Sequence, residues 1–171
     1  MSEQSMRRHE VAPEMGEFGP RTKRQYAALT GITGLRPPFV AKFFGIEPQA
    51  ASRWERDGYS YPTRQAWELV ESSMRAHLKA VETTVSTIED TYKPDDVKVL
   101  LTYYRNEHEY YEAHKDDDGG VQHAEIMWAL ADARAKTISE ELMMDGYAVE
   151  FVRPGDMPDG RADGVLVVPR G

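Results

Sequence analysis

A regular stripe of apolar side chains between residues 63 and 88 restricts the possible folds of this chain most strongly. The stripe consists of Trp67, Met74, Val81 and Ile88 at intervals of seven residues, with Val70, Leu78 and Val85 beside them. A spacing of seven keeps side chains on one face of an α-helix, and Thr63 can cap the first turn. The sequence therefore predicts a helix from Thr63 to about Ile88, roughly 37 Å long. It would pack against the rest of the chain, against a second copy, or against both.

Three shorter helices are predicted between residues 22 and 58. Thr22 can cap the first, and its apolar positions are Tyr26, Leu29 and Ile32. Pro37 favours the start of the second helix, because proline suits the first turn, and Gly45 ends it. The third helix covers residues 47–56, before an Asp-Gly break.

The C-terminal half predicts a strand-helix-helix-strand unit. Residues 97–104 and 147–152 have strand patterns, and a helical pattern covers residues 106–114. A second helix follows the loop at residues 116–120, with Ile126, Leu130, Ala133 and Ile138 to Leu142 on its inward side, and Asp145-Gly146 stops it. Two strands alone are marginally stable, so we expect a further sheet edge, with a second subunit as one source. Residues 165–168 could add a strand, although the Gly/Pro/Asp-rich segment around them favours a mobile tail.

Charge is distributed unevenly along the chain. The net charge is -8, but residues 18–64 carry eight Lys or Arg against three acids, a net charge of +5. Residues 65–171 carry a net charge of -11. Binding to phosphates depends on the local field over about 8 Å at physiological salt. A basic head on an acidic body therefore suits nucleic-acid binding.

Small and apolar residues between residues 34 and 55 have the spacing of a helix-turn-helix. The full set, which includes polar neighbours, is Gly34-Leu35, Val40-Ala41, Gly45-Ile46 and Ser52-Arg53-Trp54-Glu55, followed by Gly58 and Pro62. In this motif the second helix crosses closely over the first, and its exposed N-terminal side can enter the major groove. From about Tyr26 to Pro62 the chain resembles, in register, the Cro/repressor-like (XRE) helix-turn-helix family. One departure is Arg36-Pro37, where the family usually has Ser-Gln. Proline lacks the backbone N–H that would hold a phosphate there, so this contact is not expected in the usual form.

The resemblance implies a set of DNA contacts. Gln49 would read adenine and Arg53 guanine, each with about 1–3 kcal/mol of discrimination, and Ser52 would touch a base or a phosphate. Phosphate contacts, which position the protein without specifying sequence, are expected from Arg36, Lys42, Arg56, Arg64 and Tyr59, with Tyr61 as a further candidate.

Most of the chain also resembles a narrower group of small dimeric regulators that includes the anti-CRISPR-associated autorepressors. The residues that support this are Trp54-Glu55 to Pro62, Val99 to Tyr104-Arg105, and Gly146-Tyr147 to Val152. The group implies a homodimer, a palindromic double-stranded DNA operator and repression of the protein's own operon. Two alternatives stay open: a protein-interaction module of a toxin-antitoxin or phage pair that does not use DNA, and an RNA-binding regulator.

The expected fold is thus mainly α with a small β component. It comprises a flexible arm (1–20), a helix-turn-helix DNA-binding domain with the long helix (21–90), an α+β dimerisation domain (91–153) and a mobile tail (154–171).

Other functional classes have little support. There is no cysteine, no bilayer-length apolar run and no secretory signal, so we expect a cytoplasmic protein without a membrane partner. His108 and Glu112 share a helix face, but zinc sites need three or four ligands, so neither a metal nor another cofactor is expected. No residue set meets the requirements of an enzyme site. The tyrosines at 103, 104, 110 and 111 are expected to pack in the core or at a dimer contact.

Overall fold

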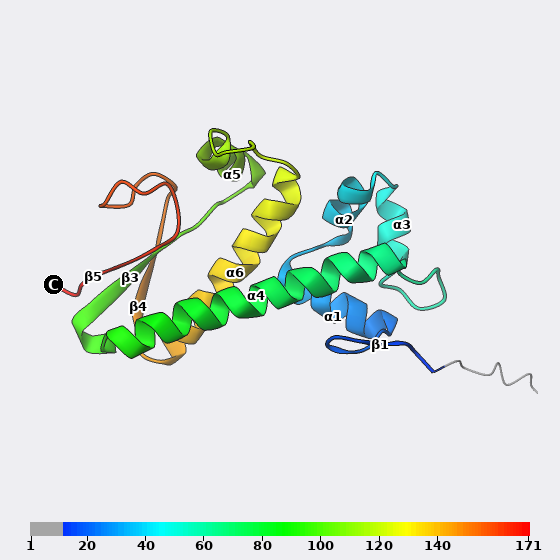
Figure 1. Ribbon diagram of the computed structural model, residues 1–171, viewed down its shortest axis with the longest axis horizontal. Coiled ribbons are helices and arrows are strands. Elements are labelled where there is room, and N and C mark those ends of the chain that lie inside the picture. Colours follow the sequence, from blue (N-terminus) through cyan, green and yellow to red (C-terminus); the bar gives the residue numbers. More distant parts are fainter. Residues whose placement is uncertain (1–11) are drawn as a thin grey trace, which may run out of the picture.

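The computed structural model describes residues 12–171 and is mainly helical with a small strand component. A basic, helical head and an α+β body are joined by two long helices that lie side by side (Figure 1). The elements, in chain order, are β1 (Met15–Gly16), β2 (Gly19–Pro20), α1 (Lys23–Thr33), α2 (Pro37–Phe44), α3 (Pro48–Arg53), α4 (Arg64–Thr91), a 3-10 turn (Pro94–Asp96), β3 (Val97–Thr102), α5 (Glu107–His114), α6 (Ala124–Met144), β4 (Ala148–Val152) and β5 (Val165–Pro169).

The long helix predicted from the apolar stripe is α4, and it serves two cores. Its first half packs into the head core beside Tyr26 and Leu35, while its second half packs into the body core beside Val99 and Leu142. The hydroxyl of Thr63 accepts a hydrogen bond from the backbone N–H of Ala66 at 3.1 Å, so the predicted cap is confirmed. Because one rigid helix spans both cores, it fixes the head relative to the body.

Two apolar positions in the predicted helices are not buried. Leu78, expected in the α4 stripe, is 45% exposed, and Ile32, expected on the inner side of α1, is 46% exposed. At the waist between the two cores α4 instead buries His77, whose ring nitrogens have no partner among the described residues. Burial, with a smaller contribution from Arg134, lowers the pKa of His77, so its ring is held neutral.

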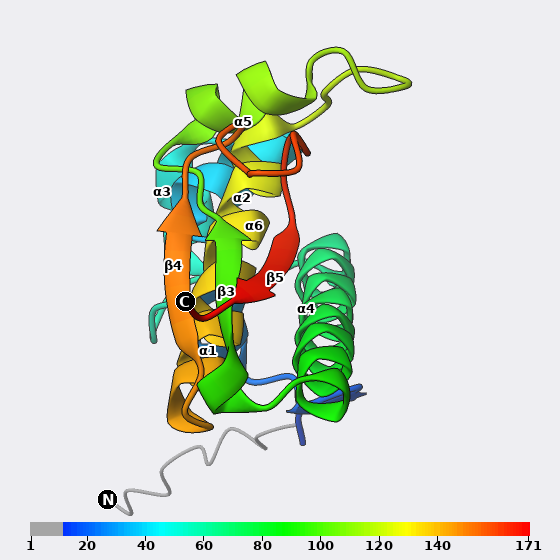
Figure 2. The ribbon, with the colours of Figure 1, turned by 90° about the vertical axis from the view of Figure 1, so that its left-hand side faces the viewer.

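The body contains a three-stranded sheet in the order β4-β3-β5. β3 pairs in parallel with β4 and antiparallel with β5. Val97, Val99 and Leu101 of β3 face the body core with α4 and α6, and Figure 2 looks onto the opposite face of the sheet. On that face Lys98 and Glu150 form an ion pair of 2.6 Å across β3 and β4.

Two boundaries expected from the sequence are corrected. Residues 154–171 were expected to be a mobile tail, but residues 165–169 form β5, which supplies the third strand from the chain itself. Residues 1–20 were expected to be a flexible arm; residues 1–11 lie outside the described part, and residues 15–20 form a short hairpin. Glu17 anchors this hairpin to α4, where its carboxylate pairs with Arg75 and its N–H donates to Glu71 at 3.0 Å.

No helix in the described range, residues 12–171, combines the length and the apolar character needed to cross a membrane.

Candidate nucleic-acid interface

The short helix α3 has one side in the head core and the other in solvent. Ala51 and Trp54 are buried, only 1% and 7% exposed. Gln49 and Arg53 are exposed, and Ser52 is half-buried. The exposure of Gln49 and Arg53 agrees with the DNA contacts that the resemblance implies for them, although α3 ends at Arg53 rather than at Arg56.

A glycine turn sets the position of α3 against α2. Gly45 adopts a left-handed conformation (φ 64°), and its N–H points at the carbonyl groups of Ala41 and Lys42 at the end of α2. Ile46 then donates its N–H to the Ala41 carbonyl at 3.0 Å. Glycine reaches this conformation without the steric cost that other residues meet. The turn is followed by Pro48 in the first turn of α3, where a missing backbone donor costs nothing.

The exposed side of α3 and the residues just after it in the chain form a small cationic and aromatic surface. The guanidinium groups of Arg53 and Arg56 lie 5.9 and 5.1 Å from the ring centre of Tyr59, which is half exposed. Neither arginine forms an ion pair with any residue in the 12–171 range. Two uncompensated cations beside an exposed ring can meet a polyanion without first breaking an internal ion pair. We call Gln49, Ser52, Arg53, Arg56 and Tyr59 the α3 surface.

Lys23 supports this surface from beneath and was not among the expected site residues. Its side chain is buried, and its ammonium donates to the carbonyl oxygens of Arg53 at 2.9 Å and Arg56 at 2.5 Å. Burial lowers the pKa of Lys23, while the nearby Asp57 acts in the opposite direction. A cation at a helix C-terminus satisfies carbonyls that have no intrahelical partner. Lys23 thus fixes the backbone that carries Arg53 and Arg56. Local sequence patterns could not predict this role, because the two contacts span 30 and 33 residues.

Other expected phosphate contacts lie elsewhere. The ammonium of Lys42 is 3.6 Å from carboxylates of both Glu107 and Glu125, so it links α2 to the body. Arg36 caps the start of α2 and lines a cleft against α6. Arg64 is exposed at the start of α4 and lies 3.5 Å from Glu68. The eight expected residues therefore do not form one surface: Lys42 and Arg36 face the body.

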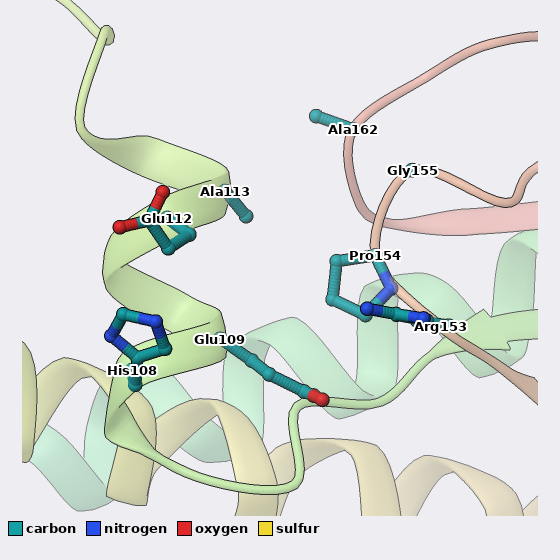
Figure 3. Close-up of a pocket in the computed structure, with 8 residues that line it drawn as sticks. All are labelled: His108, Glu109, Glu112, Ala113, Arg153, Pro154, Gly155 and Ala162. Atoms are coloured by element: carbon teal, nitrogen blue, oxygen red, sulfur yellow. The ribbon is translucent and has the colours of Figure 1, made fainter.

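His108 and Glu112 line a pocket between α5 and the 153–162 loop. In Figure 3, Glu109 extends from α5 toward Arg153, whereas Glu112 lies on the side of α5 away from the 153–162 loop. The Glu112 carboxylate instead accepts from Lys115 at 2.8 Å, a hydrogen bond that lowers the pKa of Glu112. Among residues 12–171, no three histidine or acidic side chains converge as metal ligands would.

The tyrosines at 103, 104, 110 and 111, which were expected to pack in the core or at a dimer contact, differ in burial. Tyr104 is buried, and its hydroxyl donates to Asp163 at 2.9 Å. Tyr103 and Tyr110 are half-buried, whereas Tyr111 is 44% exposed. Packing thus accounts for the first three but not for Tyr111.

No protein-family model matches the chain, and a search of curated proteins finds no match.

Proposed function

We propose that the protein is a sequence-specific double-stranded DNA-binding regulator, in which α2, the Gly45 turn and α3 act as a helix-turn-helix. The observation that carries this proposal is the exposure of Gln49 and Arg53 on a helix whose other side, Ala51 and Trp54, is buried. A helix held in this way can enter a major groove as a rigid unit.

The α3 surface divides into reading and positioning groups. Gln49 has the amide geometry to pair with an adenine edge, and Arg53 the fork geometry to pair with guanine O6 and N7. Arg56 and Tyr59 of the α3 surface, together with Arg64 at the start of α4, are assigned to phosphates, which position the protein without specifying sequence. Lys42 and Arg36 are left out of the assignment because they face Glu107, Glu125 and α6.

The acidic body favours a single orientation on DNA. Residues 65–171 carry a net charge of -11, so phosphates near the body are repelled while those near the α3 surface are attracted. We propose a homodimer that presents two copies of α3 to half-sites about 34 Å apart. The free edge of β4, which pairs with β3 alone within residues 12–171, is where we place the contact between copies. Autorepression of the protein's own operon is the regulatory role proposed.

Arginine variants on the α3 surface should separate base reading from phosphate contact. Arg53→Ala should reduce the preference for the cognate duplex over a scrambled one by about 1–3 kcal/mol, because a bidentate base contact is lost. Arg56→Ala should weaken both duplexes equally and lower the slope of log K against log salt by about 1. Fluorescence anisotropy at several salt concentrations, with DNA from upstream of the protein's own gene, measures both effects.

Two controls accompany this titration. A duplex with one half of the inverted repeat should bind more weakly than the full repeat if a dimer is the binding form. A structured RNA of equal length should compete poorly. Equal losses for Arg53→Ala and Arg56→Ala on every sequence, or RNA binding as tight as cognate DNA binding, would contradict the proposal.

A further inference from the structure

A cleft of about 610 Å³ lies between the head and the body, away from the α3 surface. Its walls come from the end of α1, the start of α2 and the middle of α6, and both α1 and α2 contact α6. The side chains that define its chemistry are Arg36, Phe39, Tyr103, Trp128, Asp132 and Lys136. No step of the proposed DNA recognition uses this cleft.

Rigid aromatic rings form one part of the cleft. Phe39 of α2 and Trp128 of α6 meet edge to face, with ring centres 5.8 Å apart. The indole N–H of Trp128 donates to the backbone carbonyl of Tyr104 at 2.9 Å, which fixes the plane of the ring. Half-buried aromatic walls, one of them held by a hydrogen bond, are suited to a flat apolar ligand, because little conformational freedom is lost on binding.

Two cations and two carboxylates line the cleft, and of the two cations Arg36 is the one that forms no ion pair in the described chain. Asp132 accepts from Lys136 at 2.8 Å, so those two charges balance. The pKa of Lys136 is raised mainly by this bond with Asp132, whereas Arg36 acts in the opposite direction, as expected of a second cation nearby. Arg36 is exposed and has no carboxylate within 4 Å in the described chain. Glu140, also in the wall, is one turn beyond Lys136.

We propose that this cleft binds a small flat organic monoanion of the aromatic carboxylate class. Its ring would lie against Phe39 and Trp128, and its carboxylate would meet the planar fork of Arg36, which matches carboxylate geometry in a bidentate manner. One unpaired cation in a cleft that Asp132 and Glu140 also line favours a monoanion over a phosphate dianion. The bound molecule would bridge α2 of the head and α6 of the body.

Benzoate is a suitable probe, and the indole N–H resonance of Trp128 in a ¹⁵N–¹H spectrum reports its binding. We expect this resonance to shift saturably, with a Kd of millimolar order for so small a ligand. The indole resonances of Trp54 and Trp67, which lie in the head core, should stay in place. Arg36→Gln should weaken binding about tenfold or more, because a charge-assisted hydrogen bond pair is lost.

Three controls decide the outcome. Arg24→Gln removes an exposed arginine of α1 that does not line the cleft, and it should leave the benzoate affinity unchanged. Benzamide, the neutral isostere, should bind at least tenfold more weakly than benzoate, and inorganic phosphate should not shift the Trp128 resonance at equal concentration. Unchanged affinity in Arg36→Gln, equal affinity for benzamide, or an equal response to phosphate would each overturn the proposal. No DNA is present, so the result is independent of the proposed regulatory function.

Discussion

Replacing Lys23 with methionine should lower the free energy of unfolding by about 2 kcal/mol or more and should abolish specific DNA binding. The ammonium of Lys23 donates to two carbonyl groups at the end of α3, and the side chain is 7% exposed. Methionine fills a similar volume but cannot donate, so the Arg56 carbonyl loses its bond from Lys23, and the Arg53 carbonyl keeps only the 3.2 Å bond from the Arg56 N–H. Hydrogen bonds from a charged donor contribute about 1.5–3 kcal/mol each, partly offset here because a buried charge is also removed.

Urea unfolding followed by circular dichroism measures this loss, since the midpoint falls with stability at constant slope. Lys79→Met is the matched control, because Lys79 is exposed on α4. The control should unfold within about 0.5 kcal/mol of the wild type, as surface substitutions usually do. Equal midpoints for both variants would show that Lys23 does not hold the end of α3.

Gly34→Ala should destabilise the protein by about 2–4 kcal/mol, because two separate costs add. Gly34 ends α1 with a φ of 81°, a left-handed conformation that alanine adopts with difficulty. In addition, a Cβ at this position would lie 2.6 Å from the backbone carbonyl oxygen of Ala129 in α6. Backbone cannot rotate away as a side chain can, so the α1–α2 turn would be pushed off α6.

Gly58→Ala separates the two costs. Gly58 has nearly the same φ, 84°, but a Cβ there meets nothing within 4 Å. It should therefore show only the conformational cost, about 1–2 kcal/mol, and the difference between the variants measures the contact between α1 and α6. Thermal unfolding of both proteins at one pH provides the comparison. If the two alanine variants lose equal stability, the close approach of Gly34 to α6 is not important to the fold.

Local patterns predicted the helices well, because periodicity and caps are properties of neighbouring residues. Thr22 and Thr63 each accept the backbone hydrogen bond expected of a cap, and Asn106 accepts one at the start of α5. The outward positions of Gln49 and Arg53 were implied by the resemblance to the helix-turn-helix family, not by periodicity alone. Pattern alone could not show that Leu78 is exposed while its neighbour His77 is buried, since this depends on how α6 crosses α4.

Contacts between residues far apart in the chain could not be predicted from the sequence. β5 follows a segment rich in glycine, proline and aspartate, and its strand is stabilised by pairing with β3 more than 60 residues earlier. The hairpin at residues 15–20 has strands of only two residues, and Glu17 ties it to α4. From the sequence, Lys42 was expected to be a cation available to phosphates, but in the structure its ammonium lies beside Glu107 and Glu125. In each case a partner from another part of the chain decides the role.

Site-directed DNA cleavage tests the central claim, that α3 enters the major groove, most directly. The chain has no cysteine, so Gln49→Cys supplies a single attachment point for an iron chelate that cleaves nearby DNA. Glu82→Cys, on an exposed position of α4 in the body, is the control. We predict cleavage from position 49 confined to the two halves of an inverted repeat upstream of the gene, and none from position 82. Absence of cleavage from position 49 in a complex that binds this DNA, or equal cleavage from both positions, would contradict the account.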